Sequence, residues 1–122
     1  MNEMIGNIKN HQEVLLYGKG GVARTFMQWL QFRHLDDYVK GFVVSQADNE
    51  RVCMDRPVIE VSNVKLTYPG ALIIVCVKNL YRAEIADMLS RYELSDYILL
   101  SDDMIKKCSI DVTHLTPRKS LK

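Results

Sequence analysis

A short apolar strand, a glycine-rich loop and a helix follow one another in residues 14–35, and this succession constrains the fold more than any other feature. The run Val-Leu-Leu-Tyr at residues 14–17 has the length of a buried strand and is too short for a helix. Helical spacing follows in the apolar side chains of Val22, Ala23, Phe26, Met27, Trp29 and Leu30. Between the two, Gly18, Gly20 and Ala23 fit the pattern G-x-G-x-x-A. The succession therefore predicts an α/β fold that opens with a strand–loop–helix unit.

Each small residue of this loop has a mechanical reason to be there. Gly18 permits a tight turn out of the strand, and Gly20 lacks the Cβ that would keep a phosphate away from the backbone. Ala23 lets the helix pack close to the strand. The free N–H groups and the positive end of the helix dipole point at the loop, which favours an anion. The pattern predicts a phosphate-binding loop, and the alternative is a tight turn that binds nothing.

Length and composition limit the class of protein. The chain of 122 residues is long enough for one domain with a buried core. Its net charge of +1 gives no reason to expect nucleic acid or an anionic membrane as a partner. The longest apolar run, residues 71–77, is too short to cross a bilayer, and residues 1–12 lack an apolar signal segment. We therefore expect a cytoplasmic protein with no membrane insertion.

The cysteines give no sign of a disulfide framework or a zinc site. Cys53, Cys76 and Cys108 are odd in number and widely spaced. Cys76 lies inside an apolar run and is expected to fill space in the core.

The remainder of the chain alternates strand-like and helix-like segments. Further strands are predicted at residues 39–44, 57–59, 71–77 and 97–100. Helices are predicted at residues 80–92 and from about residue 104, where Ser101, Asp102 and Asp103 provide capping groups. This alternation predicts a single Rossmann-like three-layer α/β domain with a parallel sheet, in strand order 3-2-1-4-5.

The predicted boundaries of the domain follow from the same alternation of strands and helices. Residues 13–116 are expected to form the Rossmann-like domain, after a loose or short helical lead-in at residues 1–12 and before a basic, disordered tail at residues 117–122. Residues 45–56 are polar and are interpreted as an exposed loop. Because this connection is too short for a full helix, one face of the sheet near the third strand is either thinly covered or covered by a partner. The helix at residues 80–92 is expected to bury Tyr81, Ile85, Met88, Leu89 and Tyr92.

A ligand is expected beyond the carboxyl ends of the strands, where the strand order reverses. Three loops meet there. The glycine loop contributes Gly18, Lys19, Gly20, Gly21 and Val22. The loop after the fourth strand contributes Lys78, Asn79 and Arg82, and the loop after the second strand contributes Ser45 and Gln46. The lysines and the arginine suit a phosphate-bearing small molecule, although a solvated surface is the alternative for each of them.

One residue expected of a dinucleotide-binding fold is missing. The second strand of such a fold usually ends in Asp or Glu, which binds the ribose hydroxyls, but here it ends in Val44 and Ser45. Asp48 follows in the loop and is close enough in sequence to reach back. This weakens the case for NAD, and no basic residue is in place for NADP. Catalytic chemistry is not predicted, because no histidine has a visible nucleophile or carboxylate partner and no metal-ligand spacing occurs.

Four short stretches together resemble a known group of domains. They are Val-Leu-Leu-Tyr-Gly-Lys-Gly-Gly-Val-Ala-Arg (14–24), Lys-Gly-Phe-Val-Val (40–44), Arg-Pro-Val-Ile (56–59) and Ile-Ile-Val-Cys-Val-Lys-Asn (73–79). The chain resembles, over residues 13–103, the Rossmann-like domains of bacterial surface-polysaccharide biosynthesis proteins. These are the N-terminal domains of sugar O- and N-acyltransferases and similar units of polysaccharide epimerase/dehydratases and glycosyltransferases.

The resemblance implies that Gly18, Gly20 and Gly21 face the phosphates of a nucleotide-sugar and that Lys78 and Asn79 lie in the matching loop. The acidic pair that normally follows Gly-Phe-Val in these domains is replaced here, Val22 stands where the acyltransferases often have histidine, and their acyl-transferring β-helix is absent.

The function expected from these observations is that of a nucleotide-binding accessory or regulatory domain. The ligand is a nucleotide-sugar or NAD, and the setting that the resemblance implies is bacterial capsule or lipopolysaccharide biosynthesis, either as part of a glycosyltransferase or sugar-modifying enzyme or as a homodimer. Two alternatives stay open. One is a protein-interaction domain with a vestigial glycine loop, and the other is a self-sufficient oxidoreductase.

Overall fold

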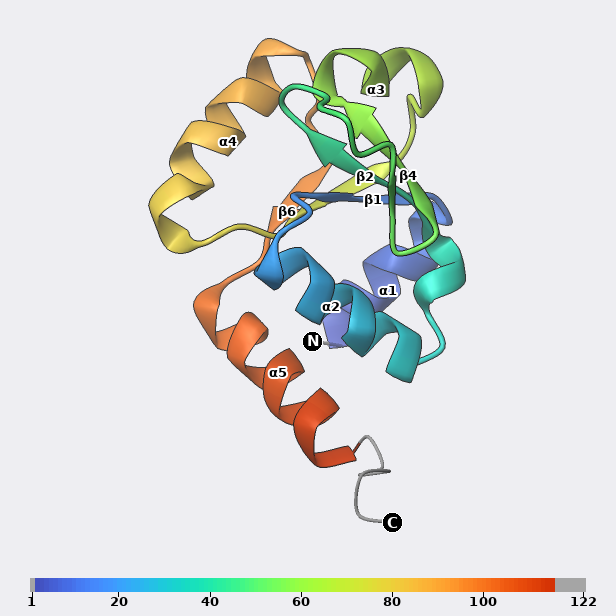
Figure 1. The fold of residues 1–122 in the computed structure, drawn as a ribbon, viewed down its shortest axis with the longest axis vertical. Helices are drawn as coiled ribbons and strands as arrows, with labels where there is room; N and C mark the ends of the chain where they lie inside the picture. Colours follow the sequence, from blue (N-terminus) through green and yellow to red (C-terminus); the bar gives the residue numbers. More distant parts are fainter. Residues whose placement is uncertain (1, 116–122) are drawn as a thin grey trace.

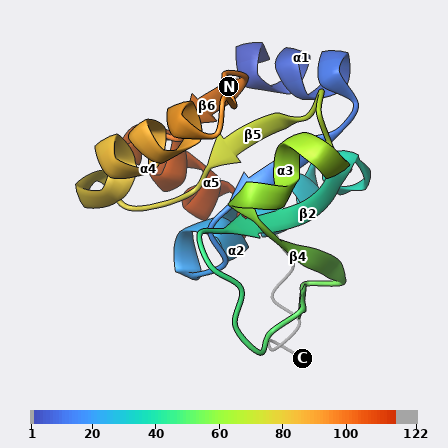
Figure 2. The same ribbon diagram turned by 90° about the horizontal axis from the view of Figure 1, so that it is seen from above.

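In the computed structural model, which describes residues 2–115, a six-stranded sheet separates two layers of helices (Figure 1). The strands are β1 (Val14–Tyr17), β2 (Val39–Val44), β3 (Val52–Cys53), β4 (Arg56–Glu60), β5 (Leu72–Val75) and β6 (Tyr97–Leu99). The helices are α1 (Asn2–His11), α2 (Gly21–Phe32), the 3-10 helix η1 (Asp36–Tyr38), α3 (Val61–Thr67), α4 (Asn79–Arg91) and α5 (Asp102–Leu115). Helices α3 and α4 cover one face of the sheet, and α1, α2 and α5 cover the other (Figures 1 and 2). The predicted three-layer α/β class is confirmed.

The strand order is β3-β4-β2-β1-β5-β6. Strands β4, β2, β1, β5 and β6 are parallel, and their order matches the predicted 3-2-1-4-5. The difference is β3, a two-residue edge strand that runs antiparallel to β4. The prediction of an exposed loop at residues 45–56 is therefore wrong at β3, where Cys53 is buried. The turn between β3 and β4 places Met54 and Asp55 at φ 47° and 66°, and Met54 is not a residue that signals such a turn.

Strand β1 lies at the centre of the core. All four of its side chains are buried, which is typical of a parallel strand covered on both faces. Leu16 points to the face where Trp29 of α2 and Ile8 of α1 are fully buried, and Leu15 points to the face where Leu89 of α4 is fully buried. The segment for which a loose or short helical conformation was expected is thus a ten-residue helix that contributes to the core.

Two smaller predictions have different outcomes. The backbone N–H of Met104 donates to Ser101 Oγ over 3.2 Å, so Ser101 caps α5 as expected. Tyr81 on α4 is 49% exposed, and Tyr92, which directly follows α4, is 42% exposed, so their expected burial is wrong. The predicted tail at residues 117–122 and the last residue of the predicted domain lie outside the described residues.

Candidate functional site

The glycine loop crosses the end of the sheet in a conformation that requires Gly18. This residue has φ +108°, in the left-handed region that favours glycine. A Cβ there would lie 2.9 Å from the carbonyl oxygen of Cys76 and 3.5 Å from Cγ1 of Val77. The Gly18 N–H donates to the carbonyl of Val43 over 2.8 Å. The loop is therefore pressed between the ends of β2 and β5, at the point where the strand order reverses.

Helix α2 begins immediately after this loop and has no capping side chain. Its N-cap is Gly20, and the Arg24 N–H donates to the Gly20 carbonyl over 3.0 Å. The first turn of α2 contains no acidic residue. A Cβ built on Gly20 or Gly21 would meet no atom within 4 Å, so the space beside them is open. The start of α2 therefore offers backbone N–H groups and a positive dipole end to an anion.

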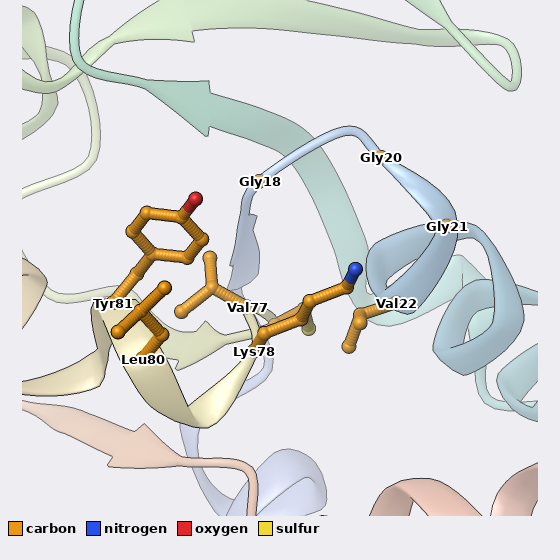
Figure 3. Close-up of a pocket in the computed structure, with 9 residues that line it drawn as sticks. Gly18, Gly20, Gly21, Val22, Val77, Lys78, Leu80 and Tyr81 are labelled. Atoms are coloured by element: carbon orange, nitrogen blue, oxygen red, sulfur yellow. The ribbon is translucent and has the colours of Figure 1, made fainter.

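A cavity of about 500 Å³ lies between the glycine loop and the β5–α4 loop (Figure 3). It is lined by Gly18, Gly20, Gly21, Val22, Cys76, Val77, Lys78, Leu80 and Tyr81. Its size is within the range of small-molecule sites, and its walls are mostly apolar apart from the loop backbone and Lys78. We call it the loop cavity.

The three cations predicted at this site have three different environments. Lys78 is exposed, and its side chain extends towards Val22 at the start of α2 (Figure 3). Within residues 2–115, no carboxylate lies at ion-pair distance from it. Of the three predicted cations, Lys78 is therefore the one that lines the loop cavity.

Lys19, by contrast, is paired with the loop that follows β2. Its Nζ lies 2.6 Å from Glu50 Oε1 and 3.2 Å from Asp48 Oδ2. These hydrogen bonds, that of Glu50 first and that of Asp48 second, raise the pKa of Lys19. The Glu50 and Asp48 carboxylates therefore balance the positive charge of the Lys19 ammonium group. The Lys19 side chain does not line the loop cavity.

Arg82 and Asn79 also turn away from the loop cavity. Arg82 Nη1 donates to Asn79 Oδ1 over 3.1 Å, and Nη2 donates to Asp102 Oδ1 over 2.6 Å. The guanidinium thus ties the first turn of α4 to the first turn of α5, and its buried Nε has no partner among the described residues. Of the remaining predicted residues, Gln46 is exposed and lines neither the loop cavity nor the second cavity, which contains Ser45.

The second cavity adjoins the loop cavity on the α4 side and has a volume of about 400 Å³. It is lined by Tyr17, Ser45, Val77, Tyr81, Glu84, Ile85, Met88 and Arg91. Burial is the largest cause that raises the pKa of Tyr17; the side chain of Ser45 opposes this shift, and the charge of Glu84 adds to it. We call this space the tyrosine cavity.

Sequence reasoning missed the side chains of α4, and Cys76 and Val77 directly after β5, that line these cavities. Leu80 is 80% exposed, and Tyr81 forms a wall of both cavities. Tyr81 has the same helical spacing as the core residues of α4. Periodicity alone therefore predicts that it is buried and cannot show that it lines the cavities. The available signal was its place one turn after the fourth strand, at the edge where ligands bind.

Neither a metal site nor a membrane-spanning helix is found in the described part of the chain. Across residues 2–115, no group of three or more His, Cys, Asp or Glu side chains could hold a metal ion. Over the same residues, no helix has both the length and the apolar character that a membrane crossing requires.

The fold and the glycine loop define a Rossmann-like α/β domain. No protein-family model and no curated protein matches the chain. Among solved structures, it is similar to RSP, a Rex-family repressor, with 17% identity and a TM-score of 0.54, over 93% of this chain and 68% of that one. It is also similar to RSP in complex with β-NADH, with 19% identity and a TM-score of 0.51, over 99% of this chain and 72% of that one. At such identities the similarity shows the fold.

Proposed function

We propose that this domain binds a dinucleotide, NAD or NADH, with the diphosphate on the glycine loop. The observation that carries the proposal is the start of α2. It has no capping side chain, it has open space beside Gly20 and Gly21, and it faces a cavity of about 500 Å³ into which Lys78 extends. Backbone N–H groups at a helix start bind phosphates in this fold class. The similar structure of RSP with β-NADH supports this choice of ligand.

The role that we propose is that of a binding module with an accessory or regulatory purpose. A nucleotide-sugar carries the same diphosphate, so it is the second ligand class to test. The setting in glycan biosynthesis rests on the sequence resemblance alone, since neither similar structure is named for such a process. The cytoplasmic location expected from the sequence belongs to the same proposal.

The ligand class is tested by a thermal-shift panel of NAD, NADH, NADP, coenzyme A and UDP-, GDP- and CDP-sugars. A ligand at about a hundred times its dissociation constant adds about 2.7 kcal/mol to the free energy of unfolding. For a domain of this length the melting temperature should rise by roughly 10 °C. A selective shift with NAD or NADH supports the proposal. If no ligand raises the melting temperature of a folded protein, the result contradicts the proposal and favours the protein-interaction alternative. Sedimentation would then test that alternative, which predicts a dimer.

The site is tested by G20V, with G70V as the matched control. Neither glycine has a positive φ, and a Cβ at either position meets no atom within 4 Å, so both variants should fold. Gly20 borders the loop cavity, whereas Gly70 lies in the turn before β5 and borders neither cavity. We expect G20V to abolish binding and G70V to retain it. Equal affinities in the two variants would exclude the glycine loop as the phosphate site.

A further inference from the structure

Arg82 on α4 carries a largely buried guanidinium group that lines neither cavity. Its side chain is 13% exposed, whereas that of its partner Asp102 is 71% exposed. Nη2 donates to Asp102 Oδ1 over 2.6 Å and Nη1 donates to Asn79 Oδ1 over 3.1 Å, while the buried Nε has no partner within residues 2–115. An ion pair with so exposed a carboxylate adds little to stability, and an unpartnered buried N–H is unfavourable. Stability therefore does not explain why this arginine is held here.

The start of α4, which forms one wall of the loop cavity, is not held in place by burial. Leu80 and Tyr81 belong to this wall, and they are 80% and 49% exposed. The N-cap of α4 makes no side-chain hydrogen bond, and the one buried residue of the helix, Leu89, lies near its other end. In the described part of the chain, the side-chain hydrogen bonds of residues 78–82 are the two that Arg82 donates. These two bonds therefore fix the first turn of the helix.

Helix α5 connects this wall of the loop cavity to the opposite one. Asp102 is the first residue of α5, and α5 packs against α2, which begins at the glycine loop (Figure 1). Further along α5, Asp111 accepts a hydrogen bond from Trp29 of α2 over 3.0 Å. The pairs Arg82–Asp102 and Trp29–Asp111 thus attach both walls of the loop cavity to the same helix.

We propose that Arg82 is a positioning residue of the dinucleotide site, which holds the α4 wall of the loop cavity in place by pairing with Asp102. This inference rests on the proposed function, because the ligand must occupy the loop cavity for the position of its wall to matter. Arg82 itself does not touch the ligand. A wall that is already ordered spares the ligand the cost of ordering it on binding. Loss of the pair should therefore weaken binding in a domain that remains folded.

The direction of the effect at Asp102 separates positioning from a direct contact with the ligand. If the guanidinium met the diphosphate itself, D102N would release it and strengthen binding. D102N also removes a negative charge, and that change alone favours an anionic ligand. If Arg82 instead positions the wall, D102N weakens binding in the same direction as R82Q. The double variant should then bind no more weakly than either single variant, because all three lose the same pair.

The experiment measures the dissociation constant of NADH by calorimetry for the wild type, R82Q, D102N, D102E and R82Q/D102N. The controls K65Q and E93Q make the same charge changes in the Lys65–Glu93 pair, whose Nζ and Oε1 lie 3.3 Å apart and which borders neither the loop cavity nor the tyrosine cavity. We expect R82Q and D102N each to weaken NADH binding about five- to tenfold. D102E keeps a carboxylate at this exposed position and should recover most of the affinity, and K65Q and E93Q should bind as the wild type does. A cooperative urea transition shows that each variant is folded.

The outcomes separate this inference from the proposed function. If R82Q weakens NADH binding and D102N strengthens it, the guanidinium meets the phosphates directly and the positioning role is overturned. If neither variant changes the dissociation constant, or if K65Q and E93Q change it equally, the role is also overturned, although the domain still binds NADH. If the wild type does not bind NADH, it is the proposed function that fails. Should R82Q not fold, D102N and D102E decide the question, because the Asp102 side chain is exposed.

Discussion

Lys19 Nζ lies 2.6 Å from Glu50 Oε1, and this ion pair ties the glycine loop to the loop that follows β2. Asp48 contributes a second contact of 3.2 Å, and Arg24 Nη2 of α2 lies 3.7 Å from Glu50 Oε2. The charge of the glycine-loop lysine is therefore balanced before any ligand arrives. The carboxylates that balance it also stand close to the site proposed for the diphosphate, where their charge is unfavourable to binding.

Removing these carboxylates should strengthen diphosphate binding. We expect the double variant D48N/E50Q to bind ADP about two- to fivefold more tightly at low salt, which is the range of an exposed charge interaction. The gain should disappear at about 0.5 M salt, where screening is strong. Calorimetry with ADP at both salt concentrations measures it. The control for net charge is E3Q/E13Q, which also removes two exposed carboxylates but neither of those that pair with Lys19. Weaker binding by the double variant would mean that the pairing positions the loop for its ligand.

Gly18 should be the residue of the loop that the fold cannot replace. In G18A the new Cβ would lie 2.9 Å from the Cys76 carbonyl oxygen, and the residue would keep an unfavourable positive φ. We expect a loss of about 1–3 kcal/mol in the free energy of unfolding. Urea unfolding followed by the fluorescence of the buried Trp29 measures the loss. The control is G70A, for which we expect a change of about 0.5 kcal/mol or less. Equal stability of G18A and G70A would contradict the strained geometry.

The order of the parallel strands could be predicted because the signals were local. The apolar runs that form β1 and β5 are buried on both faces of the sheet. The change from strand to helix after Gly18 is indicated by residues that are adjacent in the sequence. Strand β3 could not be predicted in the same way. Two residues are too few for a period, and the pairing of Val52 with Pro57 depends on a turn at Met54 and Asp55 that carries no glycine or proline.

The candidate site was predictable in its backbone and less so in its side chains. The loop glycines and Lys78 line the cavity, because their places follow directly from the ends of β1 and β5. Lys19 and Arg82 were expected beside them but pair with Glu50 and Asp102, which come from other segments of the chain. Such pairings depend on how distant loops meet, and that information is not contained in residue spacing.

The contact between α2 and α5 includes a polar bond that stability measurements can isolate. Trp29 Nε1 donates to Asp111 Oδ2 over 3.0 Å, and the Trp29 side chain is fully buried. D111A would leave a buried N–H without its partner, for which we expect a loss of about 1–3 kcal/mol. D111N keeps an acceptor oxygen in the same place, so it should recover most of that loss. Urea unfolding of both variants decides the matter, and an equal loss in D111N and D111A would contradict a role for this bond.

The three cysteines should be unreactive as long as the domain is folded. Cys53, Cys76 and Cys108 are 2%, 2% and 0% exposed. Burial raises the pKa of all three thiols, that of Cys108 to about 12 and that of Cys76 further still. Because the thiolate is the nucleophile, a chromogenic disulfide reagent should modify the native protein only as fast as it unfolds. In denaturant all three thiols should react at once. A rapid native reaction of one equivalent would show that a thiol is accessible.

The same thiols predict how stability depends on pH on the alkaline side. Their folded pKa values are raised, so their contribution is fully present below about pH 8.5, the usual value for a free thiol in an unfolded chain. As the pH rises from there towards about 12, the unfolded chain releases thiol protons that the folded chain keeps, and the free energy of unfolding falls. Urea unfolding of the wild type and of C108A at about pH 7.5 and 9.5 measures this slope. We expect a shallower slope in C108A, because it has one titrating thiol fewer; identical slopes would contradict the burial of Cys108.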